Sequence, residues 1–413
     1  MHIGINAQLL SYSQSYRNSG VSRYIRRLLE GLAQEPGEYR YTIFVNGHEV
    51  EEQLAPVARH PQLTYVSAPW PEERPWTRVA WEQLKLPGEL RQRRIRLLHS
   101  PVNVLPLRLP AGCRGVVTLH DLAFLRFPEV LTGPKRLYQR TFTLRSLRRA
   151  TLVVTVSEST RRDAIELLSL PAERLRTVYP CIDARFRASP RDEQAVQALR
   201  ARYGLESGFI LYLGTLEPRK NLDTLIEAFA RLKRQQGLRE KLVLAGSKGW
   251  LYDAIFARVR SLGLESEVLF PGFIADSEQV LWYHAATAFA YPSLYEGFGL
   301  PVAEALACGL PVVTSSVSSL PEAGAGVALT VEPRDVDALA HALYRALNDE
   351  SYRQHCRAMA STVAERFSLR TMARQIRAVY EEALSEKQSE EERQVLQSEP
   401  WPQREEHHVS SLE

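Results

Sequence analysis

Short apolar runs alternate with stretches of helical periodicity along most of the chain. Runs such as Ile3–Ile5, Val116–Leu119 and Phe209–Leu213 are short and rich in aliphatic, β-branched or aromatic residues, which predicts buried strands. Between such runs, apolar residues recur every three or four positions, as in Leu222–Arg231, which predicts amphipathic helices. Strands that alternate with helices favour parallel sheets with crossover helices, so the expected fold class is α/β.

The expected elements form two successive α/β units. In the first unit, strands are expected at Ile3–Ile5, Tyr41–Val45, Leu97–His99, Val116–Leu119, Leu152–Val156 and Arg176–Val178, with helices at Val21–Leu32, Lys135–Arg148 and Ser159–Leu168. In the second unit, strands are expected at Phe209–Leu213, Leu242–Ala245, Val268–Phe270, Ala288–Tyr291, Val312–Thr314 and Val327–Leu329, with helices at Leu222–Arg231, Tyr252–Arg260, Glu278–His284, Val302–Ala307 and Val336–Leu347.

The segment between the two units is polar and contains Pro190, which indicates a linker. We therefore expect a first domain at 1–182, a linker at 183–205, a second domain at 206–367, a helix at 368–385 that packs back on the first domain, and a disordered acidic tail at 386–413. A length of 413 residues agrees with two domains, because one core rarely serves a chain of this size.

Composition narrows the class of protein. The 4 cysteines lie far apart, so neither a zinc site nor a disulfide framework is expected. No signal segment or membrane span is expected either, and we predict a cytoplasmic protein. The net charge of +4 conceals an excess of basic residues in the first domain, where 26 Lys and Arg stand against 16 Asp and Glu. Anionic partners should therefore meet this domain.

The stretch YPSLYEGFGLPVAEALACGLPVV carries the clearest chemistry. It predicts a strand, a loop at Gly297-Phe298-Gly299, and a helix that starts near Pro301. Free N–H groups at such a helix start favour a phosphate or pyrophosphate. Glu296 precedes the loop and Glu304 is expected in the first helical turn, so both carboxylates flank the anion site, where they can accept hydrogen bonds from sugar hydroxyls.

This stretch resembles the E-x7-E signature of retaining glycosyltransferase family 4. The resemblance implies the GT-B fold, with two Rossmann-like, doubly wound parallel-sheet domains that face a central cleft. It also implies metal-independent transfer from a nucleotide-sugar, without a cofactor. In the family, Glu304 would hold the ribose and Glu296 the hexose, and the donor-binding positions that match here are Gly297, Phe298, Gly299 and Leu300.

A second segment, FILYLGTLEPRKNLDTLIEAFARL, predicts a strand, a loop and a helix capped by Asn221. In the family, the basic residues that match Arg219 and Lys220 bind the donor diphosphate, and Gly214 lies at the strand end. Many members have Arg where this chain has Thr215, so Arg219 must supply the guanidinium. The wording of the loop resembles mannosyltransferases of bacterial surface-polysaccharide pathways, which makes GDP-mannose the expected donor.

The first domain contributes two positions through the same resemblance. NSGVSRY resembles the family's Gly-Gly-x-x-Arg loop, with Gly20 as the matching glycine. His120, at the end of a predicted strand, matches a histidine that contacts the donor sugar across the cleft. In the second domain, Phe273 and Ile274 are expected to form the pocket for the base.

Three other patterns are interpreted as structural. Asp335-Val336-Asp337 matches the DxD metal motif, but it opens a helix, where Asp acts as a cap. His407 and His408 lie in the tail without further ligands, so no metal site is expected. Ser157 is expected to be a helix cap rather than a catalytic group.

The acceptor is expected to be a glycan or a lipid-linked glycan held by the first domain. Its basic clusters, Arg91, Arg93, Arg94 and Arg96 with Arg145, Arg148 and Arg149, fit either a peripheral contact with an anionic membrane or a solvated surface. Binding of nucleic acid is not expected. A Rossmann oxidoreductase is excluded because GxGxxG is missing. A GT-B epimerase, a phosphorylase and a non-catalytic sugar-nucleotide-binding protein remain alternatives.

Overall fold

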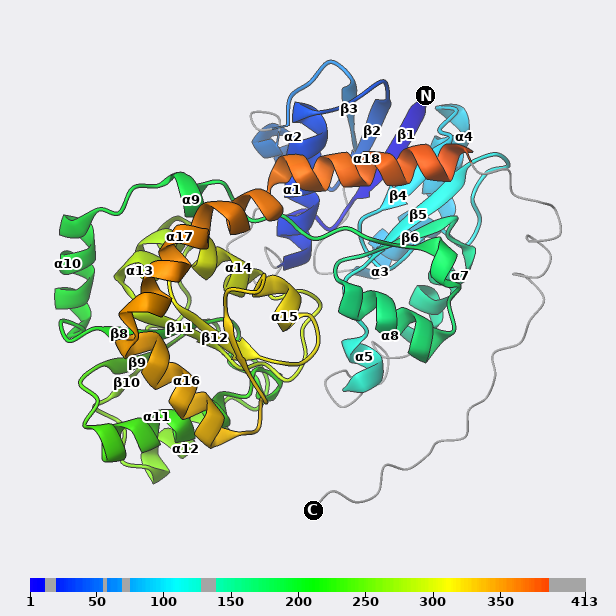
Figure 1. Cartoon of the computed structure of the whole chain (residues 1–413). Coiled ribbons are helices and arrows are strands. Elements are labelled where there is room, and N and C mark those ends of the chain that lie inside the picture. Colours follow the sequence, from blue (N-terminus) through cyan, green and yellow to red (C-terminus); the bar gives the residue numbers. More distant parts are fainter. Residues whose placement is uncertain (12–19, 55–57, 69–74, 128–138, 386–413) are drawn as a thin grey trace, which may run out of the picture.

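The computed structural model describes residues 1–11, 20–54, 58–68, 75–127 and 139–385. Two parallel sheets of 7 and 6 strands form the cores of two lobes that lie side by side (Figure 1). The expected fold class, two doubly wound α/β domains, is confirmed. The expected disordered tail at 386–413 and the start of the expected helix Lys135–Arg148 lie outside the described residues.

The sheet of the first domain has the strand order β3-β2-β1-β4-β5-β6-β7, and all of its strands are parallel. Its strands are β1 (His2–Ala7), β2 (Arg40–Val45), β3 (Leu63–Ser67), β4 (Leu97–Ser100), β5 (Arg114–Leu119), β6 (Leu152–Thr155) and β7 (Leu175–Thr177). Neighbouring residues of a strand supply opposite faces of the sheet. Thus Val116 joins the core beneath α1 (Gly20–Gln34), while Val117 joins a separate core on the other face.

Helices cover both faces of this sheet. Besides α1, they are α2 (His48–Leu54), α3 (Pro75–Ala80), α4 (Leu86–Gln92), α5 (Ala123–Arg126), α7 (Leu144–Arg149) and α8 (Glu158–Leu168), with π-helical turns at Trp81–Lys85 and Gln139–Thr143. Ser157 is the N-cap of α8, because its side chain accepts a hydrogen bond from the N–H of Thr160. The prediction that Ser157 is a cap is confirmed.

The second sheet repeats the same winding in the order β10-β9-β8-β11-β12-β13. Its strands are β8 (Phe209–Leu213), β9 (Lys241–Ala245), β10 (Val268–Leu269), β11 (Ala288–Tyr291), β12 (Val312–Ser315) and β13 (Leu329–Val331). The helices of this part of the chain are α9 (Arg185–Ala188), α10 (Glu193–Tyr203), α11 (Leu222–Gln236), α12 (Asp253–Ser261), α13 (Gln279–Ala285), α14 (Leu300–Ala307), α15 (Leu320–Ala323), α16 (Val336–Asn348) and α17 (Glu350–Arg366).

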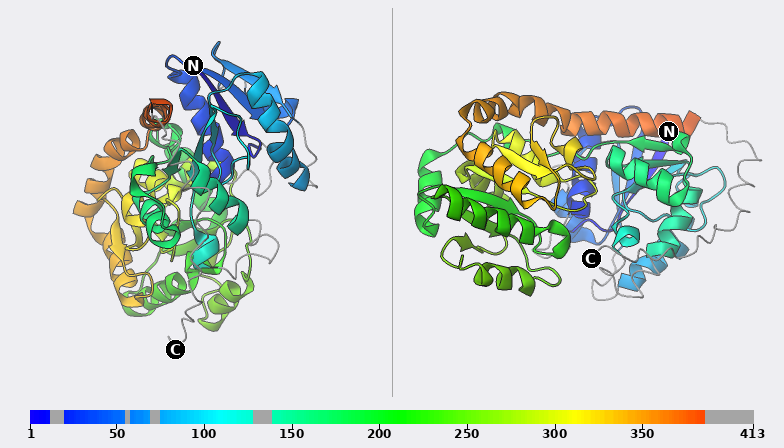
Figure 2. Two further views of the ribbon diagram at one scale, coloured as in Figure 1. Left: turned by 90° about the vertical axis from the view of Figure 1, so that its right-hand side faces the viewer. Right: turned by 60° about the horizontal axis from the view of Figure 1, so that its bottom comes forward.

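The last helix, α18 (Leu369–Ser385), runs from the second lobe back along the first (Figures 1 and 2). It packs against α1, β4, β5 and β6. The hydroxyl of Tyr380 lies 2.6 Å from Nδ1 of the buried His99, and the Arg114 guanidinium donates to the Ala383 carbonyl at 2.7 Å. Helix α18 therefore completes the core of the first domain.

Several elements differ from the sequence prediction. Strand β3 was not expected, and neither was α17, whose low contrast between apolar and polar faces hides it. Strand β13 begins two residues later than predicted. Asn221 occupies the N-cap position of α11, as predicted, but its side chain does not accept a hydrogen bond from the helix; its side-chain amide donates to the Pro292 carbonyl at 3.1 Å and also to the Pro333 carbonyl.

Candidate functional site

Both sheets reverse their strand order at one point, and ligands of doubly wound folds bind in the crevice beyond such points. The reversal lies between β1 and β4 in the first sheet and between β8 and β11 in the second. The segments after β8 and β11 carry Arg219, Lys220 and Glu296. Arg219, Lys220 and Glu296 therefore lie at the switch point of the second domain.

Glu296 is the centre of a buried cluster of charges. Its Oε1 accepts a hydrogen bond from Lys220 Nζ at 2.5 Å, and its Oε2 lies 3.3 Å from Arg219 Nη1. Lys220 is 6% exposed and Glu296 8% exposed. Burial alone would raise the pKa of Glu296, but Lys220 and Arg219 outweigh it and hold the pKa at about 2. Glu296 is therefore an anion at neutral pH.

The two cations of this cluster are fixed by further contacts. Lys220 Nζ donates to the hydroxyl of Tyr291 at 2.9 Å, and Arg219 Nη1 donates to the Tyr295 carbonyl at 2.7 Å. Glu217 pairs with Arg219 at 2.8 Å. The 3-10 turn Pro218–Lys220 thus holds both cations beside Glu296, as the sequence placed them in one loop.

The glycine loop leads into α14. Gly299 adopts a φ of +100° at the N-cap, which disfavours any residue with a Cβ. The first N–H groups of a helix have no partner within the helix, so they can bind an anion. The helix starts at Leu300, which places Glu304 in its second turn. The expectation that Glu304 lies in the first turn is wrong, because Glu304 is the fifth residue of the helix.

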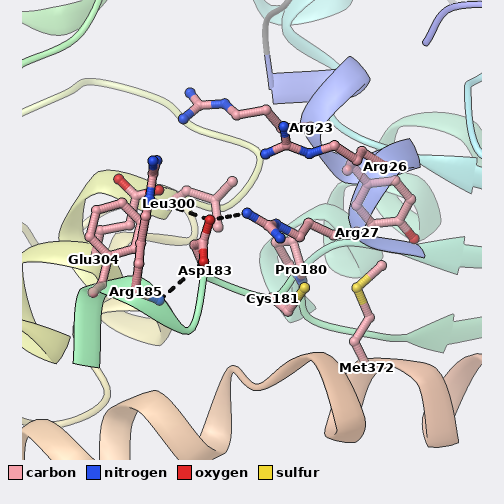
Figure 3. A pocket seen from close by; sticks show the side chains of 12 residues that line it. Arg23, Arg26, Arg27, Pro180, Cys181, Asp183, Arg185, Leu300, Glu304 and Met372 are labelled. Atoms are coloured by element: carbon pink, nitrogen blue, oxygen red, sulfur yellow. Dashed lines mark hydrogen bonds and ion pairs between the residues drawn. The ribbon is translucent and has the colours of Figure 1, made fainter. Parts of the chain in front are cut away.

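Glu304 is a second buried carboxylate, 5% exposed (Figure 3). Its Oε2 accepts a hydrogen bond from the Tyr283 hydroxyl at 3.0 Å. Burial raises the pKa of Glu304, and Arg23 and Arg185 only partly offset this effect. Arg23 comes from α1 of the first domain, so Glu304 borders the gap between the lobes. The cavity there measures about 20 Å³.

His120 lies directly after β5, where the first domain meets the glycine loop. A Cβ at Gly297 would stand 2.1 Å from the His120 carbonyl oxygen, so the two segments are in direct contact. The Nε2 of His120 lies 2.9 Å from the Pro101 carbonyl. A carbonyl can only accept a hydrogen bond, so Nε2 carries the proton. Burial lowers the pKa of His120, which leaves Nδ1 unprotonated at neutral pH.

Further contacts between the domains gather around the same loop, and the sequence reasoning did not assign them. The Gly297 carbonyl accepts hydrogen bonds from Ser157 Oγ at 2.7 Å and from Thr160 Oγ1 at 3.3 Å. The Tyr295 hydroxyl donates to Asp163 at 2.8 Å and accepts from the N–H of Leu122 at 3.1 Å. No local sequence signal could have found these pairs, because their members lie 132 to 173 positions apart.

The other predicted positions differ in their surroundings. Gly214 donates its N–H to the Ala245 carbonyl and has no room for a Cβ, since the Tyr212 hydroxyl would be 2.7 Å away. Gly20 starts α1 and is exposed. Phe273 is 65% exposed, but Ile274 belongs to the core of the second domain. Of the two side chains expected to form the base pocket, that of Phe273 is exposed and that of Ile274 is buried.

The side chains of Phe298 and Leu300 also have different surroundings. The buried ring of Phe298 packs edge-on against Phe367 at 5.1 Å, so its side chain supports the loop rather than facing a ligand. Leu300 is half-buried and lines the small cavity beside Glu304. The backbone of the loop can therefore contact a ligand, while the buried side chain of Phe298 holds the loop in place.

Within the described residues, His, Cys, Asp and Glu do not form a group of three that could hold a metal ion. Asp335 caps α16 by accepting a hydrogen bond from the N–H of Ala338, as predicted from its position. None of the helices in the described ranges is both long and apolar enough to cross a membrane. His407 and His408 lie outside the described residues.

Comparison with known families agrees with this arrangement. Residues 18–186 match "Glycosyltransferase Family 4" and residues 197–363 match "Glycosyl transferases group 1". A relative, the O-antigen chain mannosyltransferase B of Escherichia coli, is 35% identical over 68% of this chain and 72% of its own length. The chain belongs to this family of glycosyltransferases, which have the GT-B fold.

Two further proteins extend the comparison. The serotype-specific mannosyltransferase WbdA of Escherichia coli is 26% identical over 89% of this chain, which spans 46% of that relative's length. The crystal structure of Anabaena HepE in complex with UDP-glucose superposes with a TM-score of 0.68 at 19% identity, over 92% of this chain and all of HepE. The second similarity shows the shared fold.

Proposed function

We propose that the chain transfers mannose from GDP-mannose to a hydroxyl of a glycan or glycolipid, with retention of the anomeric configuration and without a metal ion. The observation that carries the proposal is the buried cluster of Glu296, Lys220 and Arg219 beside the N-terminus of α14. Two relatives named as mannosyltransferases support the choice of sugar, and HepE bound to UDP-glucose supports a nucleotide-sugar donor.

In this proposal the charged residues of the second domain bind the three parts of the donor. Arg219, Lys220 and the backbone N–H groups at Gly299 stabilise the negative charge of the leaving diphosphate. The carboxylate of Glu296 accepts hydrogen bonds from the hexose hydroxyls, and Glu304 does the same for the ribose. Gly20, Gly214 and Phe273 border the donor. In this proposal residues 1–182 carry the acceptor side and residues 206–367 the donor side.

The transfer step needs no residue as nucleophile. The acceptor oxygen forms a bond to the anomeric carbon as the bond to the β-phosphate oxygen breaks, and the bonding electrons leave with the nucleoside diphosphate. The hydroxyl proton passes to that phosphate on the same face of the sugar. His120 contacts the donor sugar from the first domain, and its contact with Gly297 means that the lobes must be closed.

A thermal-shift panel of GDP-, UDP- and ADP-sugars tests the donor, because a ligand that binds the native state raises Tm. GDP-mannose should give the largest shift, and NMR of the product should show an α-mannoside formed from the α-linked donor. Activity should persist in EDTA. A β-product, or a larger shift with UDP-sugars, would contradict the proposal. Product analysis also distinguishes an epimerase, a phosphorylase and a binding protein.

We further propose a cytoplasmic enzyme that touches the inner face of an anionic membrane through the basic residues of its first domain. Two of these basic residues already make contacts within the protein. Arg93 pairs with Glu89, and Arg149 donates to the Leu107 carbonyl. Arg145 is exposed. Binding to phosphatidylglycerol vesicles should weaken as salt rises from about 0.05 M to 0.5 M. Absent or salt-insensitive binding would contradict the contact.

A further inference from the structure

A cavity of about 320 Å³ lies between the lobes, on the first-domain side of the segment that carries Glu296. Its walls come from the end of α5, from α8, and from the chain around Tyr295 and Ser318. A volume of this size falls at the lower end of the range for small-molecule sites. It is far larger than the cavity beside Glu304.

The cavity is lined by the kinds of group that recognise a neutral sugar. The rings of Phe127 and Tyr295 stand 5.9 Å apart and tilted at 51°, which offers apolar surface to the C–H face of a pyranose. Arg162 and Glu166 lie one turn apart on α8 with exposed side chains, and both line the cavity. A guanidinium and a carboxylate can together donate to and accept from vicinal hydroxyls.

The charges of the cavity indicate what it does not bind. Arg126 and Arg162 are balanced by Asp163 and Glu166, so the lining has no net charge. The carboxylate of Asp163 is already occupied by protein partners, since it pairs with Arg126 and accepts a hydrogen bond from the Tyr295 hydroxyl. A phosphate or diphosphate would gain nothing from such a balance. A hydroxyl-rich neutral ligand fits it.

The cavity also has the right position for an acceptor. Tyr295 contributes its ring to the cavity, while its own carbonyl accepts from Arg219 and the next residue, Glu296, faces Lys220. One short segment therefore separates the cavity from the cluster assigned to the donor. We propose that this cavity binds the sugar units of the acceptor glycan, which rests on the proposed transferase function.

The test uses the full chain and two variants at exposed positions, Arg162→Ala and Glu166→Gln. Arg161→Ala is the matched control, because Arg161 precedes Arg162 on the same helix but does not line the cavity and faces Glu158 and the Ala172 carbonyl. The probes are α-linked mannotriose, chitotriose and maltotriose. Their binding is followed by saturation-transfer NMR, and their KM is measured at saturating donor.

At least one trisaccharide should bind the unaltered chain, and inorganic phosphate should not displace it. In each cavity variant, the KM of the trisaccharide that binds should rise at least tenfold, because a hydrogen bond to a charged group is lost. The KM of the donor, the release of sugar to water and the behaviour of Arg161→Ala should stay unchanged. This split would not arise from a general loss of structure.

The outcomes separate the two proposals. If the unaltered chain transfers sugar but both cavity variants match Arg161→Ala within twofold, the cavity is not the acceptor site. Displacement of the trisaccharide by phosphate would have the same consequence. If no nucleotide-sugar supports transfer, the proposed function fails, and the NMR signals still decide whether the cavity binds a glycan. Absence of binding by all three trisaccharides would overturn the assignment.

Discussion

The carboxylate of Glu322, in the second domain, accepts a hydrogen bond from the backbone N–H of Ser159 at the start of α8 in the first domain, at 2.8 Å. Its other oxygen accepts from the N–H of Glu158 at 2.7 Å. A carboxylate at a helix N-terminus is stabilising because it satisfies free N–H groups and complements the helix dipole. One lobe thus supplies part of the helix cap of the other.

Replacing Glu322 should loosen the closed arrangement. In Glu322→Ala, the amides of Glu158 and Ser159 lose their acceptor, so hydrogen exchange at these two amides should become at least several times faster. Amides inside β8 should be unaffected. Glu322→Gln keeps one acceptor oxygen, so its exchange rates at these amides should lie between those of the unaltered protein and Glu322→Ala. Unchanged exchange at α8 in the alanine variant would show that this contact does not hold the lobes together.

Lys220→Ala should lower kcat/KM at least tenfold, because a charge-assisted hydrogen bond contributes about 1.5–3 kcal/mol. The change also leaves Glu296 buried beside Arg219 alone, so Tm must be measured in parallel. Lys220→Arg keeps the charge and should retain more activity than the alanine variant at similar stability. Full turnover by folded Lys220→Ala would remove Lys220 from the donor site.

The pH dependence of stability should report on Glu296. Its pKa is about 2 in the folded protein against an ordinary value near 4.5, so its contribution to stability is present above pH 4.5 and is lost as the pH falls toward 2. The shift corresponds to roughly 3 kcal/mol. Urea unfolding between pH 6 and 3 should show a smaller loss in Glu296→Gln than in the unaltered protein. Equal slopes would contradict this assignment.

Glu304 should behave in the opposite way. Burial raises its pKa, so the folded protein loses stability as the pH rises past the ordinary value of the carboxyl group. Glu304→Gln should therefore gain stability relative to the unaltered protein between pH 4 and 8, while its KM for the donor rises about tenfold. A variant that loses both stability and affinity would indicate a purely structural carboxylate.

Gly297→Ala should separate domain closure from folding. The new Cβ would meet the His120 carbonyl of the other domain, but Gly297 has no positive φ that would strain the chain. Transfer should fall at least tenfold while Tm changes little. The control is Gly88→Ala, an exposed position in α4 with no heavy atom within 4 Å of the added Cβ, which should leave activity unchanged.

The sequence was most informative where chemistry and local structure coincide. Arg219, Lys220 and Glu296 could be placed together because each follows a strand of one sheet and parallel strands end at the same edge. It was least informative about Asn221, whose side chain bonds to carbonyls 71 and 112 positions away. The pairing of Glu322 with α8 depends on the docking of two domains, which no local pattern encodes. The burial of Ile274 in the core was likewise not evident from the local sequence.

The path of α18 has a consequence for how the protein is made. The first domain emerges from the ribosome with part of one face of its sheet still uncovered beside α1, since Met372, Ile376 and Tyr380 follow much later in the chain. His99, buried without charge and with a pKa of about 3, meets its partner Tyr380 only after some 280 further residues have been synthesised. The first domain should therefore remain dependent on α18 until that helix has been synthesised, and nascent chains released before it should expose an apolar surface that chaperones bind.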